Sequence, residues 1–347
     1  MPAVGQEAVA DDAGIARWRE LALAIEQGVG SAIVGQERVI HLMNIALFAR
    51  GHVLLEGDVG VGKTTLLRAF SRAVGGAYER VEGTIDLMPA DLVYFTYIGE
   101  DGRPRVDPGP ILRQGEALAT FFFNEVNRAR PQVHSLLLRV MAERQVTAFN
   151  KEWNFPHLIV YADRNRVERE ETFELPAAAR DRFLMEISVQ TPSDDAVLSD
   201  LMFEPRFHDV DALIESVPEA LVPYRQLNGI ARQIQNSVHL ATAMKAYLLK
   251  LWKALRAPAS VGLTLDGVVM EEFIHGGGSP RGMSYLIRAL RVEAWLKGRD
   301  YVIPEDVRSV FTEVVGHRMF FNPIYEHRRD ELLAHYLDGV LARVAAP

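Results

Sequence analysis

The chain contains no cysteine among its 347 residues, so neither a disulfide framework nor a thiolate metal site is possible. It has no apolar run near the ~18 residues of a membrane span, and its acidic, alanine-rich start lacks the pattern of a secretion signal. Net positive charge is lacking too, because the formal charge is −8, which argues against a general nucleic-acid-binding surface. These absences predict a cytoplasmic protein.

Lysine is scarce in an otherwise ordinary composition. With 48% hydrophobic and 24% charged residues, the chain has the make-up of a soluble globular protein with room for two domains. Only six of the 38 basic residues are lysine, at positions 63, 151, 245, 250, 253 and 297. In so arginine-rich a chain, a lysine indicates a place where a compact ammonium serves better than a planar guanidinium.

A glycine-rich motif surrounds the first of these lysines. Residues 57–64, GDVGVGKT, fit G-x-x-x-x-G-K-[ST], with the apolar run Val53–Leu55 before them and a helical pattern after them. The glycines allow backbone N–H groups to wrap around phosphate oxygens, and the helix start adds positive potential. The motif predicts a P-loop, in which Lys63 reaches the β- and γ-phosphates and the Thr64 hydroxyl binds Mg²⁺.

Polar residues follow two further buried runs. Leu118–Phe123 leads into Asn124 and Glu125, and His157–Ala162 leads into the sequence DRNR at 163–166. Because parallel strands present their carboxyl ends at the ligand-binding edge of an open α/β sheet, we expect these residues beside the P-loop. Glu125 can then orient or deprotonate the water that attacks the γ-phosphate, and a solvated loop glutamate is the alternative.

Two hairpins and a helical tail are also predicted. Tyr94–Val106 and Val146–Phe155 have the alternation and turn residues of hairpins, although an ordinary surface hairpin explains the first equally well. Residues 191–218 contain prolines and indicate a connection between domains. Five helical patterns follow this connection and predict a lid.

Arginines stand at two places that suit phosphate chemistry. Ala177–Phe183 is expected to begin a helix whose Arg180 and Arg182 face solvent or a neighbouring subunit. In the tail, a serine and a proline start a helix and place Arg281 in its first turn. A cation is unfavourable at a helix start, so this arginine is easier to understand if it faces a phosphate.

Four stretches together resemble the MoxR family of AAA+ ATPases, in the helix-2-insert group. They are GTIDLMPADL with DPGPI, NEVNRARPQVHSLLLRVMAERQVT, ELPAAARDRF and GGGSPR, within residues 33–320. The resemblance implies an AAA+ αβα core with a parallel sheet and an all-helical lid, in a hexameric ring that hydrolyses ATP at subunit boundaries. The expected layout is a disordered start (1–13), a core (14–190) with hairpin inserts near 93–107 and 146–155, a linker (191–218) and a lid (219–347).

The resemblance also implies roles for single residues. Lys63 and Thr64 correspond to Walker A, Glu125 to the Walker B glutamate, Asn165 to sensor 1, Arg182 to the arginine finger and Arg281 to sensor 2. Thr64 and Asn124 are expected beside Mg²⁺. The implied nucleotide-binding set is Val34, Gly35, Asp58, Gly60, Val61, Gly62, Lys63, Thr64, Thr65 and Arg281. Arg180, Arg164 and Arg166 are alternatives that could assist Arg182.

Three departures from the family pattern affect these expectations. Asn124 replaces the Walker B aspartate, ADRNR at 162–166 replaces the usual ATQNP, and AAAR precedes the finger where the family tends to have EAQL. An amide oxygen accepts hydrogen bonds but carries no charge, so Asn124 predicts weaker Mg²⁺ binding and slow hydrolysis.

The sequence and the family resemblance leave three functions open. The first is a chaperone-like remodeller, which by resemblance works with a von Willebrand A-domain protein to mature or activate a client enzyme complex, often during metal-cofactor insertion. The second is a hydrolysis-impaired assembly module that ATP holds together. The third is a nucleic-acid motor, which is disfavoured because the first hairpin contains Arg103 and Arg105 but no lysine, and no separate nucleic-acid module is evident.

Overall fold

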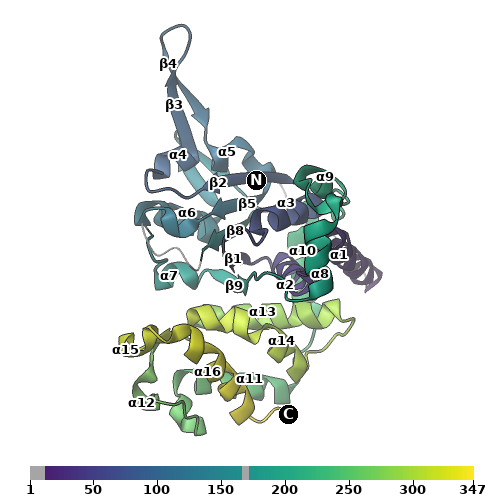
Figure 1. Cartoon of the computed structure of the whole chain (residues 1–347), viewed down its shortest axis with the longest axis vertical. Helices are drawn as coiled ribbons and strands as arrows, with labels where there is room; N and C mark the ends of the chain where they lie inside the picture. Colours follow the sequence, from purple (N-terminus) through teal and green to yellow (C-terminus); the bar gives the residue numbers. More distant parts are fainter. Residues whose placement is uncertain (1–11, 166–171) are drawn as a thin grey trace, which may run out of the picture.

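A computed structural model describes residues 12–165 and 172–347 and shows an α/β core packed on a helical lid (Figure 1). This architecture confirms the predicted fold class. Of the start that was predicted to be disordered, residues 1–11 lie outside the described range, whereas Asp12 and Ala13 already belong to the first helix. No helix in the described part of the chain is long and apolar enough to cross a membrane.

The core contains a five-stranded parallel sheet in the order β2-β5-β8-β1-β9. Its strands are β1 (His52–Glu56), β2 (Ala77–Glu82), β5 (Leu118–Asn124), β8 (Ile159–Arg164) and β9 (Phe183–Ser188). All of β5 is buried, as expected for a parallel strand that helices cover on both faces. Because β1 lies between β8 and β9, the loop after β1 opens at the carboxyl edge beside the ends of both neighbouring strands.

Helices flank the sheet on both faces (Figure 1). They are α1 (Asp12–Ala32), α2 (Glu37–Phe48), α3 (Lys63–Val74), α4 (Pro89–Val93), α5 (Pro110–Arg113), α6 (Pro131–Glu143) and α7 (Ala177–Arg180). Side chains of α1, α2 and α3 share one hydrophobic cluster, and those of α6 belong to another. The helix predicted over Ala177–Phe183 ends early at Arg180, because Phe183 already pairs with His52 as the first residue of β9.

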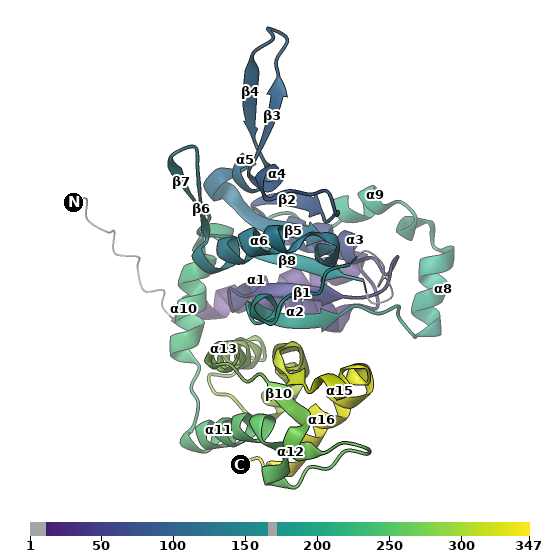
Figure 2. The same ribbon diagram turned by 90° about the vertical axis from the view of Figure 1, so that its left-hand side faces the viewer.

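Two antiparallel hairpins project from the core on the side away from the lid (Figure 2). The first joins β3 (Tyr94–Ile98) to β4 (Pro104–Pro108), and the second joins β6 (Gln145–Ala148) to β7 (Lys151–Asn154). The first hairpin exposes large apolar side chains, namely Phe95, Tyr97, Ile98 and Val106.

The stretch 191–218 is more than a connection, because it contains α8 (Asp195–Phe203) and α9 (Val210–Glu215). The carboxylates of Asp194 and Asp209 accept hydrogen bonds from the first turns of these helices and fix where they begin. The chain continues through α10 (Leu227–Ser237) into the lid, which contains α11 (Thr242–Arg256), α12 (Met270–Phe273), α13 (Pro280–Leu296), α14 (Pro304–Val315), α15 (Pro323–Glu326), α16 (Arg329–Arg343), and the short ribbon of β10 (Ile274–Gly276) and β11 (Phe320–Phe321).

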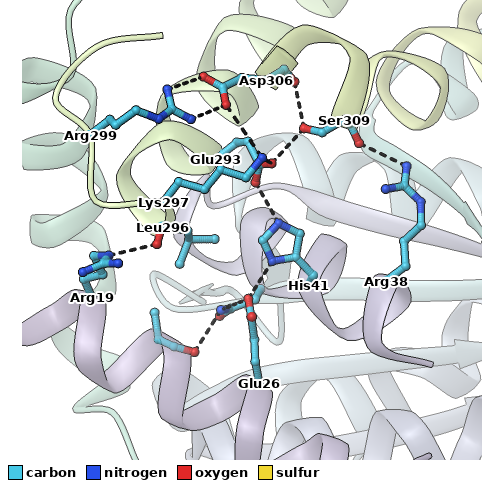
Figure 3. A network of polar contacts seen from close by, with 12 residues as sticks. Arg19, Glu26, Arg38, His41, Glu293, Leu296, Lys297, Arg299, Asp306 and Ser309 are labelled. Carbon is cyan, nitrogen blue, oxygen red and sulfur yellow. Dashed lines mark hydrogen bonds and ion pairs between the residues drawn. The ribbon is translucent and has the colours of Figure 1, made fainter. Parts of the chain in front are cut away.

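A charged network joins core and lid (Figure 3). His41 of α2 contacts Glu26 of α1 at 2.9 Å through Nδ1 and Glu293 of α13 at 2.7 Å through Nε2. Glu293 is buried, and it also contacts Lys297 Nζ at 2.7 Å and accepts a hydrogen bond from the Ser309 hydroxyl at 2.8 Å. Every charge at the centre of this junction therefore has an opposite partner.

The His41 contacts predict that stability depends on pH. Burial lowers the pKa of His41, but hydrogen bonds and charge from Glu26 and Glu293 outweigh it and raise the pKa from 6.5 to about 9. A raised folded-state pKa means that the contribution is complete below about pH 6.5 and is lost as the pH rises through about 9. Its full size is at most roughly 3 kcal/mol. Thermal unfolding should show wild type losing its advantage over His41→Gln across this window, and parallel pH profiles would contradict the prediction.

Candidate nucleotide-binding and hydrolysis site

The P-loop connects β1 to α3 and needs its glycines for two reasons. A Cβ on Gly57 would lie 2.3 Å from the carbonyl oxygen of Val189, so no side chain fits there. Gly60 and Gly62 both have φ of +84°, in the left-handed region that glycine adopts without strain. Gly62 is the residue before α3, which begins at Lys63, so the loop delivers the lysine to the start of the helix.

The Lys63 ammonium is buried among oxygen atoms. Its Nζ donates to the Gly57 carbonyl at 2.6 Å, to Asn165 Oδ1 at 2.6 Å and, more weakly, to the Asp58 carbonyl at 3.3 Å. Asp163 Oδ2 lies 3.4 Å away and forms an ion pair with it. Since an ammonium has three donors, a phosphate oxygen that binds Lys63 must replace at least one of these partners.

Asn165 links Lys63 to the predicted catalytic carboxylate. While its Oδ1 accepts from Lys63, its Nδ2 donates to Glu125 Oε1 at 3.1 Å. The other carboxylate oxygen of Glu125 accepts from Arg128 Nη1 at 3.0 Å. The structure thus brings Lys63, Asn165 and Glu125 together at the carboxyl edge. This arrangement can hold a carboxylate ready to orient a water beside the terminal phosphate.

Asp163 lies at the edge where the sequence placed it, but the sequence interpretation gave it no role in the site. It lies at the end of β8, is 1% exposed, and accepts a hydrogen bond from the Glu125 backbone N–H at 2.5 Å. That bond holds Glu125 in a left-handed conformation with φ of +53°, which is strained for a residue with a side chain. Burial raises the pKa of Asp163, whereas the Glu125 N–H and Lys63 act in the opposite direction. The signal in the sequence that could have indicated this role is an acidic residue at the end of a buried strand.

The residues present suit Mg²⁺, which prefers oxygen ligands. The amide nitrogen of Asn124 donates to Glu82 Oε1 at 2.7 Å, so its Oδ1 remains the acceptor. Asn124 ends β5, and Asp163 lies near the end of β8, which pairs with β5 through Phe123 and Ala162. The Thr64 hydroxyl, the Asn124 oxygen and the Asp163 carboxylate would hold the ion, whose charge would polarise the phosphate oxygens.

A cavity of about 280 Å³ next to the P-loop has an apolar wall that suits a nucleobase. Five members of the predicted nucleotide-binding set line it: Val34, Gly60, Val61, Gly62 and Thr65. Gly35, in the same turn, has φ of +72°, and a Cβ there would lie 2.6 Å from Pro192. Asp58, Lys63 and Thr64 stand in the adjoining loop and helix start.

The sequence interpretation also missed the far wall of this cavity. It comes from the stretch predicted to be a connection, and its apolar members are Pro192, Leu201, Phe207, Val210 and Leu213. Apolar residues at helical spacing after Asp194 were the signal for α8.

Arg182 lies at the opposite edge of the sheet. It precedes Phe183, which pairs with His52 at the start of β1, whereas the P-loop follows the end of β1, where Glu56 pairs with Ser188. The six residues of β9 span about 20 Å. The guanidinium of Arg182 donates to the Ala178 carbonyl at 2.7 Å. Arg182 therefore cannot reach the P-loop of its own chain.

Arg281 accompanies Arg182 instead of reaching the P-loop. Its Nη1 lies 2.7 Å from Asp181 Oδ2, and Asp181 Oδ1 also accepts from the Ser279 hydroxyl at 2.6 Å and from Arg318 Nε at 3.2 Å. In the isolated chain Arg281 therefore lies with Asp181, away from its own P-loop, and its contact with a phosphate stays a prediction. Asp181, between the two candidate finger positions, attaches the start of α13 to the core.

The alternative finger residues have other contacts. Arg180 stacks over the ring of Phe320 at 4.8 Å. Arg164 forms ion pairs with Glu56 at 2.9 Å and Glu186 at 3.1 Å, across three neighbouring strands. Arg166 lies outside the described residues.

This strand order, with a P-loop after β1, polar tips on β5 and β8 and a helical lid, defines an ATPase of the AAA+ class. Residues 52–185 match the model of the ATPase family associated with various cellular activities (AAA), and residues 269–335 match the AAA lid domain. Protein MoxR of Methylorubrum extorquens is 57% identical, with 97% of this chain and 98% of that protein covered. Chaperone MoxR1 of Mycobacterium tuberculosis is 35% identical, covering 91% and 79%.

A solved structure of a candidate ATPase from Cytophaga hutchinsonii superposes with a TM-score of 0.82 at 27% identity, covering 97% of this chain and 98% of the other. The chain belongs to the MoxR family of AAA+ ATPases, as the sequence predicted.

The apolar wall generates a prediction about nucleotide affinity. Phe207→Ala should weaken ADP and a nonhydrolysable ATP analogue equally, by about tenfold, because the ring borders the space for the base and not the phosphates. Fluorescence titration measures both affinities. Phe203→Ala is the matched control, since Phe203 is 72% exposed and outside the cavity lining. A loss confined to the ATP analogue would contradict this assignment.

Proposed function

We propose that the chain forms a cytoplasmic ring, in the simplest case a hexamer, whose subunits complete one another's ATP sites and use hydrolysis to remodel a client protein. The observation that carries this proposal is the separation of Arg182 from its own P-loop along β9. A guanidinium at the amino edge of the sheet can stabilise transferred phosphate only in the site of another copy.

Within each shared site the residues would divide the work. The P-loop and Lys63 bind the phosphates, and Glu125, oriented by Asn165, positions the attacking water. Arg182 of the neighbouring copy offsets the negative charge that develops on the transferred group. Arg281 is held beside it through Asp181 and acts on the same neighbouring nucleotide.

Asp163 offers a substitute for the missing Walker B aspartate. Its carboxylate is paired with Lys63 at 3.4 Å. When Lys63 turns to phosphate, that carboxylate becomes available to Mg²⁺ on the strand next to Asn124. We infer that the site keeps one carboxylate for the ion, displaced from β5 to β8.

Two observations support client remodelling: the similarity to a named chaperone and the exposed apolar side chains of the first hairpin. A relative at 35% identity is named a chaperone. The β3–β4 hairpin carries Phe95, Tyr97 and Ile98 exposed and points away from the lid, so it suits contact with a client or a partner at the ring face. A von Willebrand A-domain protein and a client metalloenzyme receiving its metal cofactor are the partners proposed from the family resemblance.

Asn124 favours a second candidate function. Its amide contributes no charge to the metal site, and its nitrogen is engaged by Glu82. If Asp163 does not replace the lost carboxylate, hydrolysis is impaired and bound ATP serves to assemble the ring. Steady-state phosphate release, compared with nucleotide-dependent assembly by light scattering, separates the two functions.

Mixing two inactive variants tests the shared site. Arg182→Ala should bind ATP normally and lose about 10³-fold in hydrolysis. Glu125→Gln should bind ATP without turnover. In mixed rings, an Arg182→Ala subunit retains Glu125 and can receive Arg182 from a Glu125→Gln neighbour, so phosphate release should reappear. Persistent inactivity of rings shown to be mixed would refute a trans arginine.

Measurements of metal affinity test whether Asp163 supplies the carboxylate that Asn124 lacks. Asp163→Asn should raise the Mg²⁺ concentration for half-maximal nucleotide affinity by about tenfold, because the protein oxygens that remain, those of Thr64 and Asn124, are uncharged. Asn124→Asp in the same chain should restore it. Manganese titration followed by electron paramagnetic resonance reports ion binding independently of hydrolysis. An unchanged metal affinity in Asp163→Asn would show that Asp163 serves Lys63 and Glu125 alone.

A further inference from the structure

A second cavity, of about 500 Å³, lies where core and lid meet on the amino edge of the sheet. Arginines from four parts of the chain line it. Arg50 stands between α2 and β1, Arg144 follows α6, Arg232 belongs to α10, and Arg288 belongs to α13 of the lid. Asn228 and Gln235 of α10 line another side, and Figure 2 shows α10 running beside the core toward α13. The lining of this cavity shares no residue with the nucleotide pocket.

The guanidiniums of Arg50, Arg144 and Arg288 have no acidic partner among the described residues, and no carboxylate is among the groups that shift their pKa values. Their hydrogen bonds go to neutral oxygens: Arg50 to Asn228 Oδ1 and the His157 carbonyl, Arg144 to the Pro156 and Arg50 carbonyls, and Arg288 to the Ala49 carbonyl. Arg50 is only 7% exposed, and its Nη1 has no partner in the described chain.

The backbone compensates little of this charge. Ala49 is at the carboxyl end of α2, and a helix end contributes about half a negative charge against three full positive ones. Burial, then the charges of Arg144 and Arg288, lowers the pKa of Arg50 to about 9. Burial, then Arg144, lowers that of His52 to about 3, so the histidine is neutral. Buried charge of one sign is costly until an anion neutralises it.

We propose that this cavity binds a compact anion carrying at least two phosphoryl groups, at a site separate from the P-loop. Arginine forks match pairs of phosphate oxygens, and three converging guanidiniums suit a charge of two or three rather than one. The amides of Asn228 and Gln235 can donate to the same oxygens. A volume of about 500 Å³ exceeds what one orthophosphate fills and lies in the range of ligand sites.

The position of the site predicts a consequence of binding. Arg50 and Arg144 belong to the core, and Arg288 belongs to the lid, so an anion that contacts all three fastens one to the other. The ligand is distinct from the nucleotide that is hydrolysed, and the inference does not depend on the proposed hydrolysis mechanism.

Isothermal titration calorimetry tests the site on the full chain. The protein is first saturated with ADP without Mg²⁺, which pyrophosphate would chelate, and is then titrated with sodium pyrophosphate. We expect one ADP and then one pyrophosphate per chain. Arg288→Gln should bind pyrophosphate at least about tenfold more weakly and keep its ADP affinity. Arg139→Gln, which removes an exposed arginine of α6 outside the cavity, should change neither.

Further arms identify the ligand chemistry and guard against misfolding. Arg288→Lys keeps the charge and should retain part of the affinity, and pyrophosphate should raise the melting temperature of wild type but not of Arg288→Gln. A second ADP per chain that Arg288→Gln abolishes would identify a nucleotide diphosphate as the source. If citrate binds as tightly as pyrophosphate, the site does not select phosphoryl groups over carboxylates, and that part of the proposal is wrong. No saturable pyrophosphate after one ADP, or unchanged affinity in folded Arg288→Gln, overturns the proposal.

Discussion

The parallel register of β1 with β8 and β9 is the constraint on which the rest of the molecule depends. Together with the parallel pairing of β5 and β8, it directs the carboxyl ends of β1, β5 and β8 to one edge, where Lys63, Asn165 and Glu125 meet through hydrogen bonds of 2.6 and 3.1 Å. It equally directs the residues that precede these strands to the other edge. Arg182, before β9, and Arg50, before β1, are therefore remote from the P-loop of their own chain.

Charge at the junction of core and lid is arranged in two contrasting ways. Around His41 and Glu293 every charged group has an opposite partner, and hydrogen bonds raise the pKa of His41 while they lower that of Glu293 to about 2 against the effect of burial. Around Arg50 the charges are of one sign, and burial is reinforced by repulsion. The first arrangement holds the lid without any ligand. The second is completed only when an anion arrives.

Much of the fold and part of the site could be predicted from the sequence, for identifiable reasons. Glycine spacing specified the P-loop, and buried runs ending in polar residues specified β5 and β8. Asp163 was expected at this edge but received no role, because its role depends on Lys63 and Glu125, which are close only in the folded chain. The contact of Arg281 with Asp181 is equally nonlocal, since 100 residues separate them. Within 191–218, the prolines led to the prediction of a connection, although the residues after Asp194 have helical spacing. The Asp194 side chain caps the helix that they form.

Strand β9 links Arg182 to the cavity beside the P-loop. One end continues from Arg182, and the other leads through Val189, whose N–H bonds to the Glu56 carbonyl at 2.7 Å, into the wall of the base cavity. Because side chains alternate with a period of two, the strand cannot slip past β1 by one residue without exchanging its two faces. In the proposed ring, a displacement at Arg182 would therefore move β9 together with β1 and would reach the cavity beside the P-loop. Within a ring, the core of each subunit would then move as a rigid body and would not deform between Arg182 and the cavity.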